Sequence, residues 1–188
     1  MFTKRRPDRS QKRPPKPLDP VRLEELALAY VARFATSAAK LEDYLKRKLR
    51  ERGWEGEDEA PVAALVTRYV EAGFIDDAAY ARANSGSLLR RGYGQRRIGQ
   101  ALHAAGIAEE VREEVRPGIG AERRAALAMA QKRKFGPFGT AVLDRPAREK
   151  QIAALLRAGH RLDSARELVN SPSEAAALDW AAEEDGDD

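Results

Sequence analysis

The chain contains no cysteine. This absence excludes disulfide bonds, thiol nucleophiles and thiolate metal sites, and it agrees with a reducing cytoplasm. No apolar run approaches the length of a membrane-spanning helix, and the basic first residues lack the apolar stretch of a secretory signal. We therefore expect a cytoplasmic protein that makes no contact with a membrane.

Strictly alternating runs of β-branched residues, the pattern of half-buried strands, are also absent. The sequence is dominated by Ala, Leu, Glu, Arg and Lys, which are good helix formers. With 188 residues the chain is long enough to bury a real hydrophobic core. The composition therefore predicts an all-α fold.

The net charge of +4 conceals a gradient along the chain. Residues 1–20 carry seven Lys and Arg against two Asp, and residues 171–188 carry seven Asp and Glu without a base, which leaves +6 for the segment between them. Both ends offer too little apolar surface to offset the entropy of ordering, so we predict a disordered basic, proline-rich tail and a disordered acidic tail with at most a frayed turn. The basic body suits a polyanionic or acidic partner.

A repeat organises the residues between the tails. Gly53, Gly106 and Gly159 lie 53 residues apart, and each follows a leucine by four positions. Such a leucine faces the core one turn before the helix ends, and the glycine adopts the left-handed conformation that stops the helix. Three occurrences at one period indicate tandem repeats.

The hydrophobic spacing around these glycines predicts three helices in each repeat. The expected repeats span residues 21–75, 76–119 and 120–170. Expected helices begin near Pro20, after Ser37 and at Pro61 in the first repeat, and cover 76–91, 94–105 and 109–115 in the second. In the third they run from near Ala121 to a break at Gly136, and then over 146–156 and 163–169. We expect the repeats to stack into a curved, elongated body.

The sequence offers little support for catalysis, a cofactor or a metal site. Asp76 and Asp77 are adjacent carboxylates, but Asp76 is expected to cap the next helix while Asp77 lies in its first turn. His103 and His160 have no partner at metal-ligand spacing and fall at or near helix C-termini, where a surface cation is mildly favourable. We therefore predict a protein that is not an enzyme.

Arginines in the second repeat are the better candidates for function. Five of them fall within one expected helix-turn-helix: Arg82, Arg90, Arg91, Arg96 and Arg97. A shift of 53 residues places Arg47 under Gln100 and Arg50 under His103, so a partly cationic column is expected along the stacked repeats. These seven arginines are either a solvated face or a surface that recognises phosphates or an acidic protein groove.

Three blocks of the sequence resemble the RecX family. The first is Gly73-Phe74-Ile75-Asp76-Asp77-Ala78-Ala79-Tyr80-Ala81, in which a glycine and two apolar residues precede Asp-Asp and an aromatic-Ala pair. The segment from Arg91-Gly92 to Gly106-Ile107 is similar to the second repeat of that family, and Ser37–Gly53 is similar to its first-repeat helix. The resemblance covers about residues 22–116, and it reaches the third repeat through the glycine register alone.

The resemblance implies a regulator that lodges in the groove of the RecA–DNA filament, and we expect this regulator to be monomeric. There it would inhibit the ATPase, recombinase and coprotease activities of RecA, with the seven arginines contacting RecA or the DNA backbone. A different class stays open, namely a free-standing DNA-binding protein of the helix-turn-helix type, since the units are trihelical. The helix that carries Arg96, Arg97 and Gln100 is the one with residues suited to reading bases. A hydrolase has only Asp76-Asp77 in its favour.

Overall fold

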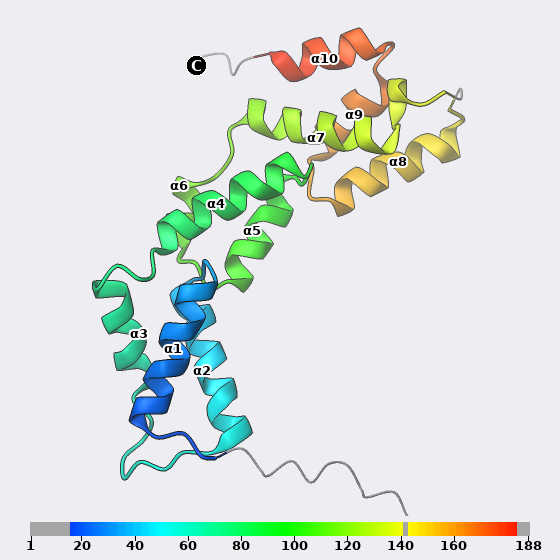
Figure 1. The fold of residues 1–188 in the computed structure, drawn as a ribbon. Coiled ribbons are helices and arrows are strands. Elements are labelled where there is room, and N and C mark those ends of the chain that lie inside the picture. Colours follow the sequence, from blue (N-terminus) through cyan, green and yellow to red (C-terminus); the bar gives the residue numbers. More distant parts are fainter. Residues whose placement is uncertain (1–15, 141–142, 184–188) are drawn as a thin grey trace, which may run out of the picture. The chain divides into compact units, whose positions relative to one another are not determined.

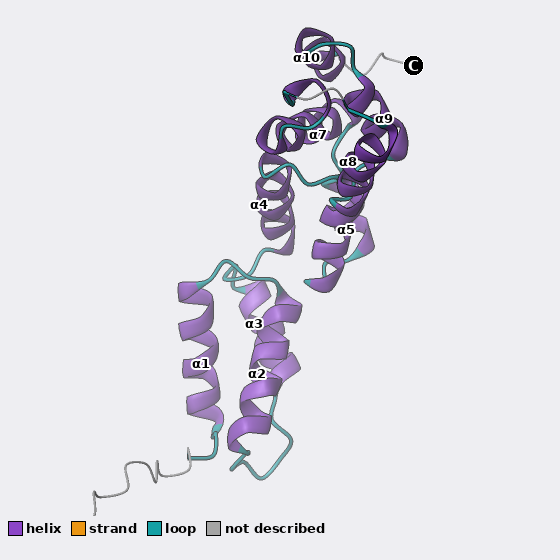
Figure 2. Ribbon diagram, turned by 90° about the vertical axis from the view of Figure 1, so that its right-hand side faces the viewer, coloured by secondary structure: helices purple, strands orange, loops and turns teal. Residues whose placement is uncertain are grey.

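The computed structural model describes residues 16–140 and 143–183, and these residues form ten α-helices and one short 3₁₀ helix, with no strand among them. Figures 1 and 2 show the helices, connected by short loops. The prediction of an all-α fold is confirmed. The chain divides into two compact units, residues 1–75 and 76–188.

The first unit is a three-helix bundle made of α1 (Pro20–Arg33), α2 (Ala38–Arg52) and α3 (Val62–Glu71). The side chain of Asp19 caps α1 by accepting from the Arg22 amide, and Ser37 caps α2 in the same way. Apolar residues at helical spacing meet in its core, which includes Leu23, Ala27, Leu41, Leu45, Leu65, Val66 and Tyr69. Local capping and one apolar stripe on each helix therefore account for this unit.

The segment just before α1 is ordered, so the prediction of disorder for residues 1–20 is wrong at its end. Leu18 is fully buried in the core of the first unit. Its amide donates to the Gly53 carbonyl at 3.0 Å, and its carbonyl accepts from the Glu55 amide at 2.8 Å. Leu18 is thus hydrogen-bonded to the backbone that directly follows α2. Residues 1–15 lie outside the described part of the chain.

The second unit contains the remaining helices. The second repeat comprises α4 (Asp77–Arg90), α5 (Gln95–Ala104) and α6 (Glu109–Glu114). The third comprises α7 (Ile119–Arg133), the 3₁₀ helix η1 (Gly136–Phe138), α8 (Arg145–Arg157) and α9 (Leu162–Asn170), followed by α10 (Glu174–Ala182). The second repeat buries Ile98, Leu102 and Ile107, and the third buries Ala126, Ala130, Leu155 and Leu168.

The repeat glycines end their helices as predicted, with positive φ angles of +82° at Gly53, +69° at Gly106 and +98° at Gly159. The second and third repeats match at the 53-residue spacing: Leu102 and Leu155 are both buried, and each carbonyl accepts from the amide five residues later at 3.1 Å.

The first repeat has a different register. Its caps, Asp19 and Ser37, precede the corresponding caps Asp76 and Gly94 by 57 residues. The difference arises because α2 has 15 residues and α5 has 10, so α2 extends further beyond the shared core. In this register the buried Leu41 and Leu45 match Ile98 and Leu102, while Leu49 is half-buried beyond the shared core.

The acidic segment after residue 171 was expected to be disordered, and for residues 174–182 this is wrong, since they form α10. Ser173 caps the helix, and Ala177 and Ala181 are buried where α10 packs against α7. The guanidinium of Arg123 on α7 lies 5.5 Å from the Trp180 ring centroid and pairs with Glu183 at 2.9 Å. The third repeat is therefore a three-helix unit extended by a docked fourth helix.

We predict that Trp180→Ala lowers the free energy of unfolding by about 1–2 kcal/mol, less than a fully buried aromatic would, because the ring is half-buried against the third-repeat core. The matched control is Leu178→Ala on the same helix, where the residue is 45% exposed and a change below about 0.5 kcal/mol is expected. Urea unfolding followed by circular dichroism measures both. Equal losses in the two variants would mean that the docking of α10 does not depend on the tryptophan.

Candidate partner-binding surface

The turn between α4 and α5 carries most of the predicted arginines. At the end of α4, the Gly92 amide donates to the Leu89 carbonyl at 2.8 Å, and the Tyr93 amide donates to the Leu88 carbonyl at 3.0 Å. Gly92 has a φ of +81°, which the glycine adopts without steric cost. This closure stops α4 and directs the chain into α5 within a few residues.

The third repeat holds this turn by direct backbone contact. The Gly94 amide donates to the Ala158 carbonyl at 3.0 Å, and the Arg96 amide donates to the Gly159 carbonyl at 3.2 Å. A Cβ atom placed on Gly94 would lie 2.4 Å from the Gly159 carbonyl carbon, so no side chain fits there. We call this contact between the α4–α5 and α8–α9 turns the glycine joint.

A histidine completes the glycine joint. The Nε2 atom of His160 lies 3.0 Å from the Gly92 carbonyl oxygen. The residue is only 5% exposed, and burial lowers its pKa, an effect that the hydrogen bond to Gly92 partly offsets. The expectation of a surface cation at His160 is therefore wrong, whereas His103 is exposed at the end of α5. The burial of His160 could not be predicted from the local sequence pattern, because its partner Gly92 is 68 residues away.

The structure brings five of the seven predicted arginines into one unit. All five are exposed, four of them bracket the α4–α5 turn, and Arg82 lies two turns earlier on α4. The four around the turn are Arg90, Arg91, Arg96 and Arg97.

Two of these side chains also make contacts within the protein. The Arg96 guanidinium donates to the Leu156 carbonyl in the last turn of α8, so it supports the glycine joint. The Arg91 guanidinium lies 5.2 Å from the Tyr93 ring centroid. Arg90 and Arg97 are the more suitable pair for contacts with a partner.

Arg47 and Arg50 lie exposed on α2, in the other compact unit. Arg47 pairs with Glu51 at 3.7 Å. When α2 and α5 are aligned at their caps, Arg47 corresponds to Ala104, not to Gln100 as the 53-residue spacing predicts. The cationic column stays a prediction. It was predicted from a 53-residue spacing, whereas the caps of α2 and α5 are 57 residues apart.

An excess of basic residues lies in the second and third repeats, before the acidic segment that ends the chain. Residues 76–170 contain 18 Lys and Arg against 11 Asp and Glu, while residues 21–75 contain nine against ten. Exposed cations of the third repeat, which the sequence prediction left out, contribute to this excess. They include Lys132, Arg133 and Lys134 at the end of α7, and Arg157 at the end of α8.

A buried carboxylate beside the glycine joint was also missed. Glu122 on α7 is 9% exposed, and burial raises its pKa while Arg161 and Arg116 act in the opposite direction. The Gln95 amide, oriented by its hydrogen bonds, donates to Glu122 Oε1 at 2.9 Å and accepts from Arg116 Nη2 at 3.0 Å. This cluster links α5 to α7 and adds a polar contact between the second and third repeats.

The adjacent carboxylates have the structural role that was predicted. Asp76 Oδ1 accepts from the Ala79 amide at 2.8 Å and caps α4, while Asp77 lies in the first turn. Among residues 16–140 and 143–183, no group of three potential ligands gathers as a metal site would require. None of the described helices is long and apolar enough to cross a membrane.

These features define a class: an all-helical protein of three-helix repeats with an excess of basic residues in the second and third repeats. A family model described as the second three-helix domain of RecX matches residues 76–115, which span α4–α6. A Myxococcus xanthus protein named Regulatory protein RecX is 35% identical over 177 residues, covering 88% of this chain and 95% of that protein. The chain belongs to the RecX family.

Two further comparisons agree with membership of the RecX family. A Thermus thermophilus protein with the same name is 38% identical over 109 residues, covering 58% of this chain and 70% of that protein. The crystal structure of RecX from Lactobacillus salivarius superposes with a TM-score of 0.61 at 18% identity, covering 78% of this chain and 91% of that one. The structural likeness extends the similarity of fold to a distant sequence.

We predict that Gly94→Ala lowers the free energy of unfolding by about 1–3 kcal/mol, because its Cβ would collide with the Gly159 backbone. Its φ of −86° suits alanine, so the effect reports the collision and not backbone strain. Gly99→Ala is the control: apart from the adjoining backbone of its own helix, no atom lies within 4 Å of the added Cβ, and a helix interior gains about 0.5–1 kcal/mol from this change. The unfolding free energies of both variants are measured by urea unfolding. A change of the same sign in both would contradict the close contact between Gly94 and Gly159.

We also predict a pH dependence from His160. A histidine whose folded pKa is below its unfolded value of 6.5 binds fewer protons when folded, so its contribution is complete above 6.5 and falls as pH drops toward the folded pKa. As pH falls from about 6.5 to about 5.5, the native protein should lose up to about 1.4 kcal/mol of unfolding free energy per pH unit that His160→Gln does not lose.

The exposed His103→Gln variant serves as the control for this pH series and should retain the wild-type slope. The raised pKa of Glu122 works in the opposite direction but is common to all three proteins, so it cancels in the comparison. Identical slopes for wild type and His160→Gln would exclude the histidine as the titrating group.

Proposed function

We propose that this chain is a cytoplasmic, monomeric regulator that binds the RecA–DNA filament and inhibits the ATPase, recombinase and coprotease activities of RecA. The observation that carries the proposal is the bracket of exposed arginines around the glycine joint, in a chain of the RecX family. The partner is inferred from the family, and the arginines supply a physical means of contact. No catalytic group is assigned.

The filament offers two kinds of negative charge, the phosphates of the DNA and acidic protein surface. Arg90 and Arg97 are exposed on either side of a turn whose backbone is fixed by the third repeat. Cations held on a rigid backbone lose less conformational entropy on binding than cations on a mobile loop. This arrangement supports contact through charge, with the DNA met at its backbone and not at its base edges.

The decisive experiment is to titrate the chain into the DNA-dependent ATPase reaction of RecA at substoichiometric ratios. A regulator that caps or interrupts a filament affects many RecA subunits, so inhibition should exceed the molar fraction of added protein. No inhibition at ratios up to equimolar would reject the proposed function.

Charge reversal tests the surface. Arg90→Glu combined with Arg97→Glu should weaken binding to the filament and flatten its salt dependence, because fewer counterions are released on contact. For phosphate contacts the slope of log affinity against log salt should decrease by up to about two. Arg145→Glu with Arg166→Glu, exposed on α8 and α9, is the control of equal charge. If both pairs reduce binding equally, net charge acts without a defined surface.

The alternative function, a free-standing DNA-binding protein, is supported by the exposed Arg97 and Gln100 on α5. Duplexes of varied sequence separate the two functions when binding is measured with and without RecA and ATP. Binding that selects a sequence without RecA favours the alternative, whereas binding that depends on the filament favours the regulator.

A further inference from the structure

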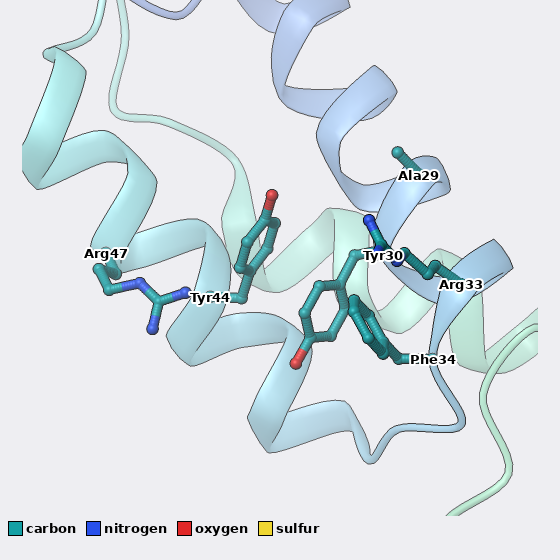
Figure 3. Close-up of a pocket in the computed structure, with 6 residues that line it drawn as sticks. All are labelled: Ala29, Tyr30, Arg33, Phe34, Tyr44 and Arg47. Atoms are coloured by element: carbon teal, nitrogen blue, oxygen red, sulfur yellow. The ribbon is translucent and has the colours of Figure 1, made fainter.

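The first unit carries a cluster of aromatic rings on its surface that the proposed function does not use. Tyr30 and Phe34 of α1 meet Tyr44 of α2 at a pocket of about 400 Å³, lined also by Ala29, Arg33 and Arg47. Figure 3 shows the three rings gathered between the two helices, with the two arginines at the sides. We call this cluster the aromatic pocket.

The rings form an ordered stack with one exposed member. The Tyr30 and Tyr44 rings lie 4.3 Å apart at an interplanar angle of 20°, which is a stacked pair. The Phe34 ring is tilted against Tyr30, with centroids 5.3 Å apart, and 49% of Phe34 is exposed. The two tyrosines thus support a phenylalanine that presents apolar surface to solvent.

Cations surround the rings. The Arg33 guanidinium lies 5.4 Å from the Phe34 ring centroid, and the Arg47 guanidinium lies 5.6 Å from that of Tyr44. Lys48 Nζ lies 5.9 Å from the Tyr44 centroid. Glu51 pairs with Arg47 and Lys48, but exposed pairs of this kind contribute little, so an incoming anion can replace the carboxylate. No acidic residue is among those that line the pocket.

The fold of the repeat does not require these rings. Alignment of the first and second repeats at their helix caps puts Ser87, Arg91 and Ala101 at the positions of Tyr30, Phe34 and Tyr44. The second repeat folds with small or charged residues at these positions. The aromatic pocket therefore distinguishes the first repeat from the second, and its rings occupy positions at which the three-helix fold does not require aromatic residues.

We propose that the aromatic pocket binds single-stranded nucleic acid, with a base stacked on Phe34 and the adjoining phosphates held by Arg33 and Arg47. A nucleotide supplies both a planar ring and an anion, and it thereby matches both components of the pocket. An acidic peptide would satisfy the cations and leave the exposed ring unmatched. In a duplex the bases stack on each other and are not available to Phe34.

This proposal does not depend on RecA, and its test omits RecA. Fluorescence anisotropy with the full-length chain measures binding to labelled oligothymidine of about 16 nucleotides, to an abasic strand of equal length and to a duplex. Phe34→Ala should weaken binding to oligothymidine about tenfold and change the other two by less than about twofold, because only oligothymidine offers a base for stacking. Phe34→Trp should retain the wild-type affinity.

Phe74→Ala is the matched control. Phe74 lies in the same unit, is 59% exposed and is tilted against Tyr69 with centroids 5.4 Å apart, much as Phe34 is tilted against Tyr30. Its removal should leave all three affinities within about twofold of wild type. Arg33→Gln should weaken binding to both single strands, with or without bases, because it removes a phosphate contact.

Several results would overturn the proposal. These are no binding of the wild-type chain to oligothymidine, equal losses for Phe34→Ala and Phe74→Ala, or an equal loss for oligothymidine and the abasic strand. Displacement of oligothymidine by a polyglutamate peptide of matched charge, with equal effectiveness, would point to an acidic protein partner and would also overturn it. Since RecA is absent, none of these results bears on inhibition of its ATPase.

Discussion

The second unit depends on a contact that only glycine allows. Gly94 and Gly159 approach so closely that a Cβ atom on either would meet backbone of the other turn at 2.4–2.5 Å. At this separation the amides of Gly94 and Arg96 reach carbonyl groups of the third repeat directly. The directions in which Arg90, Arg91 and Arg97 leave the surface are therefore set by backbone hydrogen bonds. The backbone beneath these arginines is thus held by the third repeat.

Much of the fold can be predicted from the sequence because its signals are local. Ser37 and Asp76 cap helices through a bond to the amide three residues later, and Gly53 and Gly106 stop helices through their own φ angles. Such devices act within one turn and leave a pattern in the sequence. Leu18 and α10 were missed because each is ordered by a surface elsewhere: Leu18 by the end of α2, and α10 by α7. The charge and proline content of residues 1–20 and 171–188 do not indicate whether another part of the chain offers a surface against which they can pack.

The sequence predicts which arginines make up the candidate surface, but it does not predict how they are positioned or which groups they contact. Their exposure follows from the helical pattern, whereas the bond from Arg96 to Leu156 spans 60 residues. Glu122 looks like an ordinary surface residue in the sequence, and its burial depends on packing between α5 and α7. The spacing of the glycines misled the comparison of the first and second repeats, because a longer α2 shifts the register between cap and stop.

The distance in sequence across the glycine joint has a consequence for synthesis of the chain. The Gly92 carbonyl meets its histidine partner only after 68 further residues have been added, and the Gly94 amide waits almost as long for the Ala158 carbonyl. The first unit, in contrast, closes its hydrogen bonds among residues 16–75. On the ribosome, where domains fold in order of emergence, the first bundle can be complete while the second repeat still lacks the backbone partners of its α4–α5 turn. The arginines around that turn thus acquire their final arrangement late in translation.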